Sequence, residues 1–174
     1  MLIFLVGYAG SGKSSMGKRL ARLLGLPFVD TDKLVEQMEG ASVADIFYYE
    51  GEEYFRRMER GVVDRLVEEC YEGIVATGGG LPVWEDNMER MNEIGVSVYL
   101  RRTAGQIASR LSPHGRYKRP KLRGLNDEEL VAFMTTNMAE REPFYSRATI
   151  TLDCEEMSDE RLVETIIDLV KKNE

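Results

Sequence analysis

The chain has 174 residues, a length that fits one domain with a single hydrophobic core, so we expect residues 1–174 to form one domain. Hydrophobic residues make up 43% and charged residues 30% of the sequence, which is typical of a soluble globular protein rather than a disordered chain. The 23 Lys and Arg residues against 30 Asp and Glu residues give a net charge of −7, which argues against a nucleic-acid partner.

Cysteine and histidine are scarce, and no targeting segment is visible. Two cysteines and one histidine are too few for a zinc site or a disulfide framework, and we expect both cysteines to be reduced in a cytoplasmic protein. The apolar stretch Met1–Gly7 is far shorter than the roughly 18 residues that a membrane-spanning helix needs. It also lacks the basic start and cleavage site of a signal peptide, so neither secretion nor a membrane partner is expected.

Short apolar segments alternate with amphipathic segments along the whole chain. The apolar runs predict strands at Leu2–Val6, Phe28–Val29, Ile74–Ala76, Val96–Leu100 and Thr149–Leu152. Helical spacing of apolar residues predicts helices at Ser14–Leu24, Asp32–Gln37, Val43–Tyr49, Glu52–Glu69, Asp86–Asn92, Ala104–Leu111, Asp127–Arg141 and a last helix capped by Ser158. Ser112–Asn126 has no periodicity and is expected to be a loop. The alternation predicts a three-layer α/β/α fold around a parallel sheet of about five strands.

The first loop carries a phosphate-binding pattern. Gly7–Ser14 reads Gly-Tyr-Ala-Gly-Ser-Gly-Lys-Ser and fits G-x-x-x-x-G-K-[ST] between a predicted strand and a predicted helix. Its glycines allow backbone N–H groups to turn toward phosphate oxygens, and the start of the next helix adds positive charge there. A glycine-rich turn with a chance lysine is the alternative. The residues expected to bind the nucleotide are Gly10, Ser11, Gly12, Lys13, Ser14 and Ser15.

Two carboxylates, Asp30 and Asp32, follow the second predicted strand. At the carboxyl edge of a sheet, one of them can hold the water shell of a magnesium ion while the other reaches an acceptor hydroxyl. The alternative is that one of them only caps the next helix. The sequence has no N-K-x-D segment of the kind that reads guanine, which argues against a GTP-binding switch protein.

Three further features suggest where an acceptor binds. Arg56 and Glu59 lie three residues apart on the long predicted helix, which is typical of an exposed ion pair or of a guanidinium oriented toward a substrate anion. Thr77–Gly80 follows a strand, where parallel sheets place ligands, although its glycines also suit a tight turn. Arg141 is either a second anion-binding arginine or a charge that complements the end of its helix.

The segment 112–124 is strongly basic. Its basic residues, with the arginine just before it, are Arg110, Arg116, Lys118, Arg119, Lys121 and Arg123. On an acidic protein we expect this segment to be a mobile lid that closes over phosphates, and a solvated surface loop is the alternative. Arg110 is a candidate for stacking on adenine.

Taken together, these motifs resemble the shikimate kinase family. The resemblance extends from Leu2 to about Thr151, and its most specific stretches are Gly7–Ser14, Phe28–Asp32, Ile46–Glu59, Thr77–Gly80, Arg119-Pro120 and Ala139–Arg141. It implies a P-loop kinase fold and transfer of a phosphoryl group from ATP to shikimate, with Mg²⁺, in chorismate and aromatic amino-acid biosynthesis. Lys121 departs from the family pattern, because an apolar residue usually follows Arg-Pro.

The resemblance also implies a role for each matching residue. The catalytic residues would be Asp32, which binds the acceptor hydroxyl and acts as its base, and Lys13 and Arg119, which contact the transferred phosphate. Mg²⁺ would be held by Ser14 and Asp30, and the nucleotide by the loop residues with Arg110 and Arg119. Shikimate would be bound by Asp32, Arg56, Gly78, Gly79, Gly80 and Arg141, with residues 31–69 as acceptor-binding helices and Glu59 holding the two arginines.

Two other functions stay open at this point. A gluconate-like or nucleoside-monophosphate kinase has the same architecture but a different acceptor. A nucleotide-binding regulatory or assembly module would use the basic segment to dock a partner and would show no turnover with any small acceptor. The carboxylate pair favours an enzyme, because binding alone does not require a second carboxylate, and we expect the enzyme to be a monomer.

Overall fold

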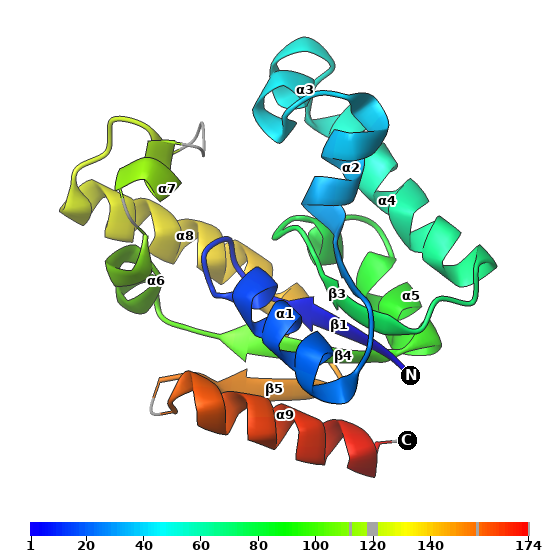
Figure 1. Cartoon of the computed structure of the whole chain (residues 1–174). Helices are drawn as coiled ribbons and strands as arrows, with labels where there is room; N and C mark the ends of the chain where they lie inside the picture. Colours follow the sequence, from blue (N-terminus) through cyan, green and yellow to red (C-terminus); the bar gives the residue numbers. More distant parts are fainter. Residues whose placement is uncertain (112, 118–121, 156, 174) are drawn as a thin grey trace.

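The computed structural model describes residues 1–111, 113–117, 122–155 and 157–173. Five parallel strands form one sheet in the order β2-β3-β1-β4-β5 (Figure 1). The strands are β1 (Leu2–Val6), β2 (Phe28–Asp30), β3 (Gly73–Ala76), β4 (Val96–Arg101) and β5 (Ile150–Asp153). The helices are α1 (Lys13–Leu24), α2 (Thr31–Glu39), α3 (Val43–Tyr49), α4 (Glu52–Glu68), η1 (Leu81–Val83), α5 (Asn87–Ile94), α6 (Ala104–Arg110), α7 (Pro113–Tyr117), α8 (Asp127–Tyr145) and α9 (Asp159–Lys172).

The strand β1 lies at the centre of the sheet and divides its core into two layers. Successive side chains of a strand point to opposite faces, so Ile3 and Leu5 pack against α1 and α9, whereas Phe4 and Val6 face α4, α5 and α8. All four side chains are fully buried. A sheet buried on both faces explains why its strands read as nearly continuous apolar runs. The predicted three-layer α/β/α fold is confirmed.

The order of the strands places several loops at one edge of the sheet. Because all strands are parallel, the chain segments that follow β1, β2, β3 and β4 leave from the same edge. The chain after β1 turns toward β2 on one side, and the chain after β3 crosses β1 to reach β4 on the other. Ligands of open α/β sheets bind at such a switch point. Helices α2–α4 and α6–α8 form two groups on either side of it (Figure 1).

Two predictions about the second half of the chain are wrong. The segment Ser112–Asn126 contains the short helix α7, and Arg116 in it forms an ion pair of 2.6 Å with Asp127. Five residues are too few to produce a readable periodicity. Helix α8 ends at Tyr145 rather than at Arg141, because the chain stays helical through Pro143. Arg141 therefore lies inside the helix, and the alternative that it complements a helix end is wrong.

The other predicted elements occur with ends that differ by a few residues. The predicted cap of the last helix is present, since the hydroxyl of Ser158 accepts a hydrogen bond from the backbone N–H of Arg161 at 3.3 Å. Among the described residues, none of the helices is both long enough and apolar enough to cross a membrane.

Candidate active site

The loop between β1 and α1 has the backbone shape that its glycines allow. Gly10 and Gly12 have φ angles of 86° and 98°, in a region that side chains other than glycine rarely adopt. A methyl group at Gly10 would also lie 3.0 Å from the Ile107 side chain. Gly12 is the N-cap of α1, so the loop leads directly into the positive end of that helix.

Polar groups of this loop face inward. Lys13 is 7% exposed, and its Nζ donates hydrogen bonds to the carbonyls of Gly7 and Tyr8 at 2.8 and 2.9 Å. The Ser11 hydroxyl is buried and has no hydrogen-bond partner within the part of the chain that the structure describes. A buried cation and an unsatisfied hydroxyl in a glycine-rich loop suit phosphate oxygens.

Asp30 caps a helix and also contacts the phosphate loop. Its Oδ1 accepts a hydrogen bond from the backbone N–H of Lys33 at 3.2 Å and so caps α2. Its Oδ2 accepts a hydrogen bond from the Ser14 hydroxyl at 2.6 Å. The second contact brings two hard oxygen ligands together on an exposed surface next to the phosphate loop. This donor set fits Mg²⁺, which binds one or two protein oxygens and completes its shell with water and phosphate oxygens.

Asp32 and Glu59 form a buried pair of carboxyl groups. Glu59 is fully buried on α4, and its Oε2 accepts a hydrogen bond from Arg56 Nη1. Asp32 Oδ1 and Glu59 Oε1 are buried, accept no hydrogen bond from an N–H donor among the described residues, and both face the α-carbon of Gly78. Burial raises the pKa of Glu59 to about 8, and burial also raises the pKa of Asp32. Adjacent buried carboxyl groups favour holding a proton between them.

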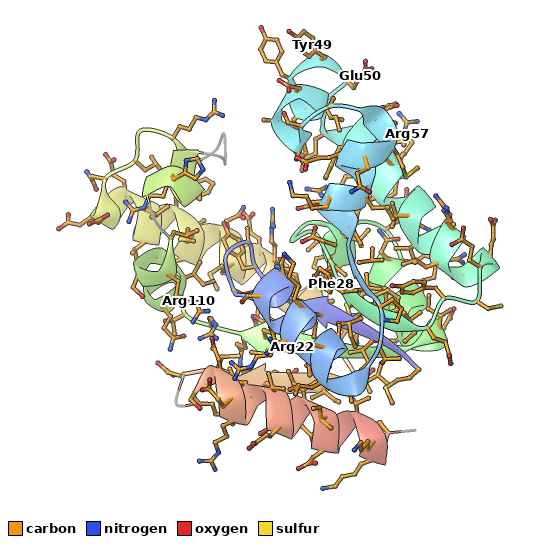
Figure 2. The ribbon with its side chains drawn as sticks, in the orientation of Figure 1. Arg22, Phe28, Tyr49, Glu50, Arg57 and Arg110 are labelled. Atoms are coloured by element: carbon orange, nitrogen blue, oxygen red, sulfur yellow. The ribbon has the colours of Figure 1, made fainter. Side chains whose placement is uncertain are left out.

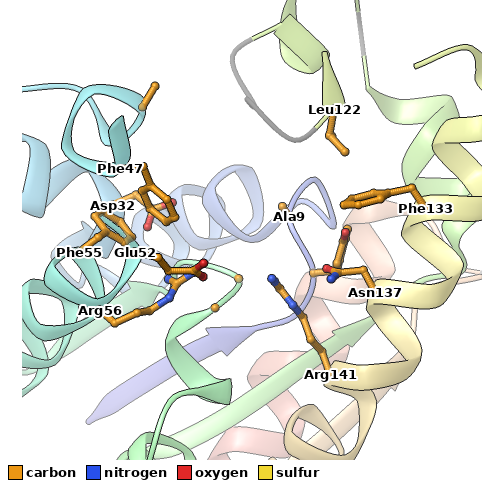
Figure 3. Close-up of a pocket in the computed structure, with 14 residues that line it drawn as sticks. Ala9, Asp32, Phe47, Glu52, Phe55, Arg56, Leu122, Phe133, Asn137 and Arg141 are labelled. Carbon is orange, nitrogen blue, oxygen red and sulfur yellow. The ribbon is translucent and has the colours of Figure 1, made fainter. Parts of the chain in front are cut away.

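Arg56 and Arg141 line opposite sides of a cavity of about 260 Å³ at the carboxyl edge of the sheet (Figure 3). The Arg56 guanidinium lies 5.7 and 5.4 Å from the ring centres of Phe47 and Phe55. The Arg141 guanidinium lies 5.4 Å from the ring centre of Tyr8. These aromatic faces hold both cations in place through cation–π attraction. Among the described residues Glu59 forms an ion pair with Arg56 and none with Arg141, so it does not hold both arginines as expected.

The backbone that follows β3, at Gly79 and Gly80, lines the cavity together with the two arginines. The N–H of Gly78 donates a hydrogen bond to the Thr31 hydroxyl at 2.8 Å, and the carbonyl of Gly79 accepts one from the Tyr145 hydroxyl. A methyl group at Gly80 would clash with the Arg56 guanidinium, and one at Gly79 would lie 3.4 Å from Arg141 Nη1. The glycines therefore allow this backbone to approach both guanidinium groups, which a tight turn alone would not require.

Arg110 and Arg119 were both expected near the nucleotide. A methyl group at Gly12 would lie 3.3 Å from Arg110 Nη2, so this guanidinium is beside the phosphate loop. Figure 2 shows Arg110 between α6 and α9, and its Nη1 is 4.0 Å from a carboxylate oxygen of Asp159. Arg119, together with Ser112, Lys118 and Lys121, lies outside the described residues.

Sequence reasoning missed several residues of the cavity. Phe133 and Asn137 lie eight and four positions before Arg141 on α8, which places all three on one face of the helix. That spacing was a readable signal. Tyr8 occupies a variable position of the phosphate-binding pattern, and Phe47 and Phe55 look like ordinary core residues, so nothing local marked them.

Comparisons with known proteins identify the family of this chain. The sequence pattern of the shikimate kinase family matches residues 9–171. A shikimate kinase from Parabacteroides distasonis is 42% identical over 98% of this chain and 97% of its own length. The crystal structure of a shikimate kinase from Bacteroides thetaiotaomicron has a TM-score of 0.89 and 34% identity, covering 98% of each chain. A shikimate kinase from Acinetobacter baumannii in complex with shikimate has a TM-score of 0.84 and 31% identity, covering 99% of this chain and 94% of its own. The phosphate loop, the carboxylates and the facing arginines thus lie in a chain that belongs to the shikimate kinase family.

Proposed function

We propose that this protein transfers the γ-phosphoryl group of ATP to a hydroxyl of shikimate, giving shikimate 3-phosphate for chorismate and aromatic amino-acid biosynthesis. The observation that supports this most directly is the pair Arg56 and Arg141 facing each other across a cavity beside the phosphate loop. Two guanidinium groups suit a carboxylate, and that preference selects an acid over a neutral sugar. In this proposal the backbone of Gly78, Gly79 and Gly80 contacts the same carboxylate ligand, and Gly79 and Gly80 line the cavity.

Asp32 is the proposed base. Its carboxyl lines the cavity between the phosphate loop and the arginines, so it can accept a hydrogen bond from the acceptor hydroxyl. As the new P–O bond forms and the bond to ADP breaks, the hydroxyl proton passes to Asp32. Burial raises the pKa of Asp32, which brings it closer to the pKa of a base that works near neutral pH.

The phosphate loop holds the nucleotide. In this proposal the Lys13 ammonium exchanges its carbonyl partners Gly7 and Tyr8 for the β- and γ-phosphates. The remaining contacts come from Gly10, Ser11, Gly12, Ser14 and Ser15, with Arg110 on the adenine side. Ser14 and Asp30 would hold Mg²⁺, which when bound neutralises charge on the phosphate oxygens. Arg119 as a contact to the transferred phosphate, and segment 112–124 as a lid, remain predictions from the sequence.

We propose that one domain, residues 1–174, acts as a monomer in the cytoplasm on its two small substrates, ATP and shikimate. A monomer is sufficient because both guanidinium groups, the base and the phosphate loop belong to the same sheet edge. Gel filtration together with light scattering tests this, and a dimer at working concentration would contradict it.

The proposed reaction is tested by ADP release with ATP and Mg²⁺ in the presence of shikimate, gluconate, AMP or no acceptor. The Lys13→Ala variant is the blank. Turnover that requires shikimate and disappears in the blank supports the proposal. Turnover with gluconate or AMP instead would replace the acceptor while keeping the nucleotide site. No turnover with any acceptor would favour a nucleotide-binding module and contradict the proposed reaction.

A further inference from the structure

Arg102, the residue that follows β4, reaches the outer side of the phosphate loop. Its side chain is 7% exposed. Its Nε donates a hydrogen bond to the carbonyl of Ser11 at 2.9 Å, and its Nη1 donates one to the carbonyl of Cys154 at 3.3 Å. Its Nη2 lies 3.8 Å from a carboxylate oxygen of Asp159, in the first turn of α9. A single buried guanidinium thus connects the phosphate loop to the chain that follows β5.

The contact with Ser11 fixes the orientation of a peptide plane. In a planar trans peptide the carbonyl of one residue and the N–H of the next point in opposite directions. Because the Ser11 carbonyl points toward Arg102, the N–H of Gly12 points to the other side of the loop. That side is where phosphates are expected. If this peptide were reversed, the Ser11 carbonyl oxygen would point toward the phosphates. The negative phosphate oxygens would repel it.

Glycine makes this orientation easy to lose. Gly12 has a φ of 98° and no side chain to restrict rotation of the adjoining peptide. The other hydrogen bonds inside the loop, from the Ser11 N–H and from Lys13 Nζ to the carbonyls of Tyr8 and Gly7, hold neighbouring peptides and not the one between Ser11 and Gly12. An external donor is therefore needed to keep this peptide in one orientation before a nucleotide arrives.

We propose that Arg102 is a positioning residue for the nucleotide phosphates, holding the Ser11 carbonyl outward so that the Gly12 N–H faces the phosphate-binding side. The inference rests on the proposed nucleotide site and adds a residue outside the phosphate-binding pattern to it. A guanidinium suits this task because its planar fork donates to two carbonyls in fixed directions, which a lysine ammonium does not reproduce.

The neighbouring Arg101 is a matched control. Its Nε and Nη2 donate to the two carboxylate oxygens of Asp153 at 2.5 and 2.6 Å, and its side chain is 43% exposed. It joins β4 to β5 and has no hydrogen bond to the phosphate loop among the described contacts. Substituting it perturbs the same end of β4 without releasing the Ser11 carbonyl.

The test compares Arg102→Gln, Arg102→Lys and Arg101→Lys with the unchanged protein. Calorimetric titration gives dissociation constants for ATP, magnesium pyrophosphate and shikimate. We expect Arg102→Gln to raise the dissociation constants for ATP and for pyrophosphate by the same factor, tenfold or more. The dissociation constant for shikimate should stay within twofold. Arg102→Lys, which keeps the charge, should lose nearly as much affinity for ATP and pyrophosphate. Arg101→Lys should change none of the three dissociation constants.

Several outcomes would overturn the proposal. If Arg102→Gln lost affinity for ATP but not for pyrophosphate, Arg102 would act on the adenine side of the nucleotide. Full affinity in Arg102→Lys would show that charge alone matters, and equal losses for ATP and shikimate would indicate a general loss of structure. If Arg102→Gln does not fold, the dissociation constants of Arg102→Lys for ATP and pyrophosphate decide between the two results. Should the unchanged protein fail to phosphorylate shikimate, only the proposed reaction fails, because the pyrophosphate constants still report on Arg102.

Discussion

Asp32 and Glu59 come from different helices, yet their carboxyl groups face each other next to the α-carbon of Gly78. Arg56 binds the other oxygen of Glu59, so the guanidinium that lines the cavity is connected to the proposed base through one buried carboxyl group. The proposed acid-binding group and the proposed base therefore share one electrostatic environment. Protonation of Glu59 changes the charge that both of them experience.

This arrangement predicts how stability depends on pH. Burial raises the pKa of Glu59 from its ordinary value of 4.5 to about 8, so the folded state binds this proton more tightly than the unfolded state does. The stabilisation is complete below pH 4.5 and is lost as the pH rises through 8. Relative to Glu59→Gln, which cannot ionise, the unchanged protein should lose free energy of unfolding between about pH 5 and 8.

Urea unfolding of both proteins at a series of pH values measures this difference. Titratable groups away from this pair contribute alike in both proteins and cancel, so the difference between the two curves reports on the coupled pair Glu59 and Asp32. Curves that stay parallel from pH 5 to 8 would contradict a raised pKa of Glu59. A difference that grows in the opposite direction would contradict the buried protonated state altogether.

The limits of the sequence are clearest at these same residues. The phosphate loop and the pair Asp30 and Asp32 were predictable because each motif lies within a few consecutive residues and follows a readable strand. The contact of Asp32 with Glu59, and that of Arg102 with Ser11, join residues far apart in the chain. Local spacing carries no signal for such pairs, since only the order of the strands brings them to one edge.

Helix ends were predictable only where residues close in the sequence determine them. Ser158 caps α9 as expected because its hydroxyl acts on the next few residues alone. Pro143 made an earlier end of α8 reasonable, since proline usually interrupts a helix. In the structure the last turn continues past it and brings Tyr145 to the carbonyl of Gly79. The last turn of α8, which Pro143 disfavours, thus occurs together with the hydrogen bond from Tyr145 to Gly79.

Asp32→Asn should lower turnover by about 10²–10⁴-fold, because the amide cannot take the hydroxyl proton. The dissociation constant for ATP should change little, since Asp32 is not part of the phosphate loop. Steady-state ADP release and nucleotide titration measure the two effects. Asp168→Asn, at an exposed position of α9, is the control and should behave like the unchanged protein. Near-normal turnover in Asp32→Asn would remove Asp32 from the catalytic role.

Arg56→Ala should raise the KM for shikimate far more than the KM for ATP, because it removes one of the two guanidinium groups that face the cavity. Arg57→Ala is a matched control on the same helix. Its side chain is 64% exposed, forms an ion pair with Glu53 and lies outside the cavity (Figure 2). Initial rates over a grid of both substrates separate the two constants. An equal rise in both would contradict the assignment of Arg56 to the acceptor.

Two glycines should respond in opposite ways to the same added methyl group. In Gly78→Ala the methyl group would clash with the carboxyl oxygens of Asp32 and Glu59, so we expect large losses of both turnover and stability. In Gly61→Ala the methyl group meets nothing within 4 Å, and the position lies inside α4. Alanine there should stabilise the fold by about 0.5–1 kcal/mol through its higher helix propensity, with turnover unchanged.

Thermal and urea unfolding together with ADP release measure both variants. Gly80→Ala adds an intermediate case, since its methyl group would meet the Arg56 guanidinium, whose side chain is 12% exposed beside the cavity, rather than two buried carboxyl oxygens. We expect it to raise the KM for shikimate while retaining more stability than Gly78→Ala. A Gly78→Ala protein with normal turnover would mean that the two carboxyl groups can move apart without cost, and the tight arrangement of Asp32, Glu59 and Gly78 would then be irrelevant to the reaction.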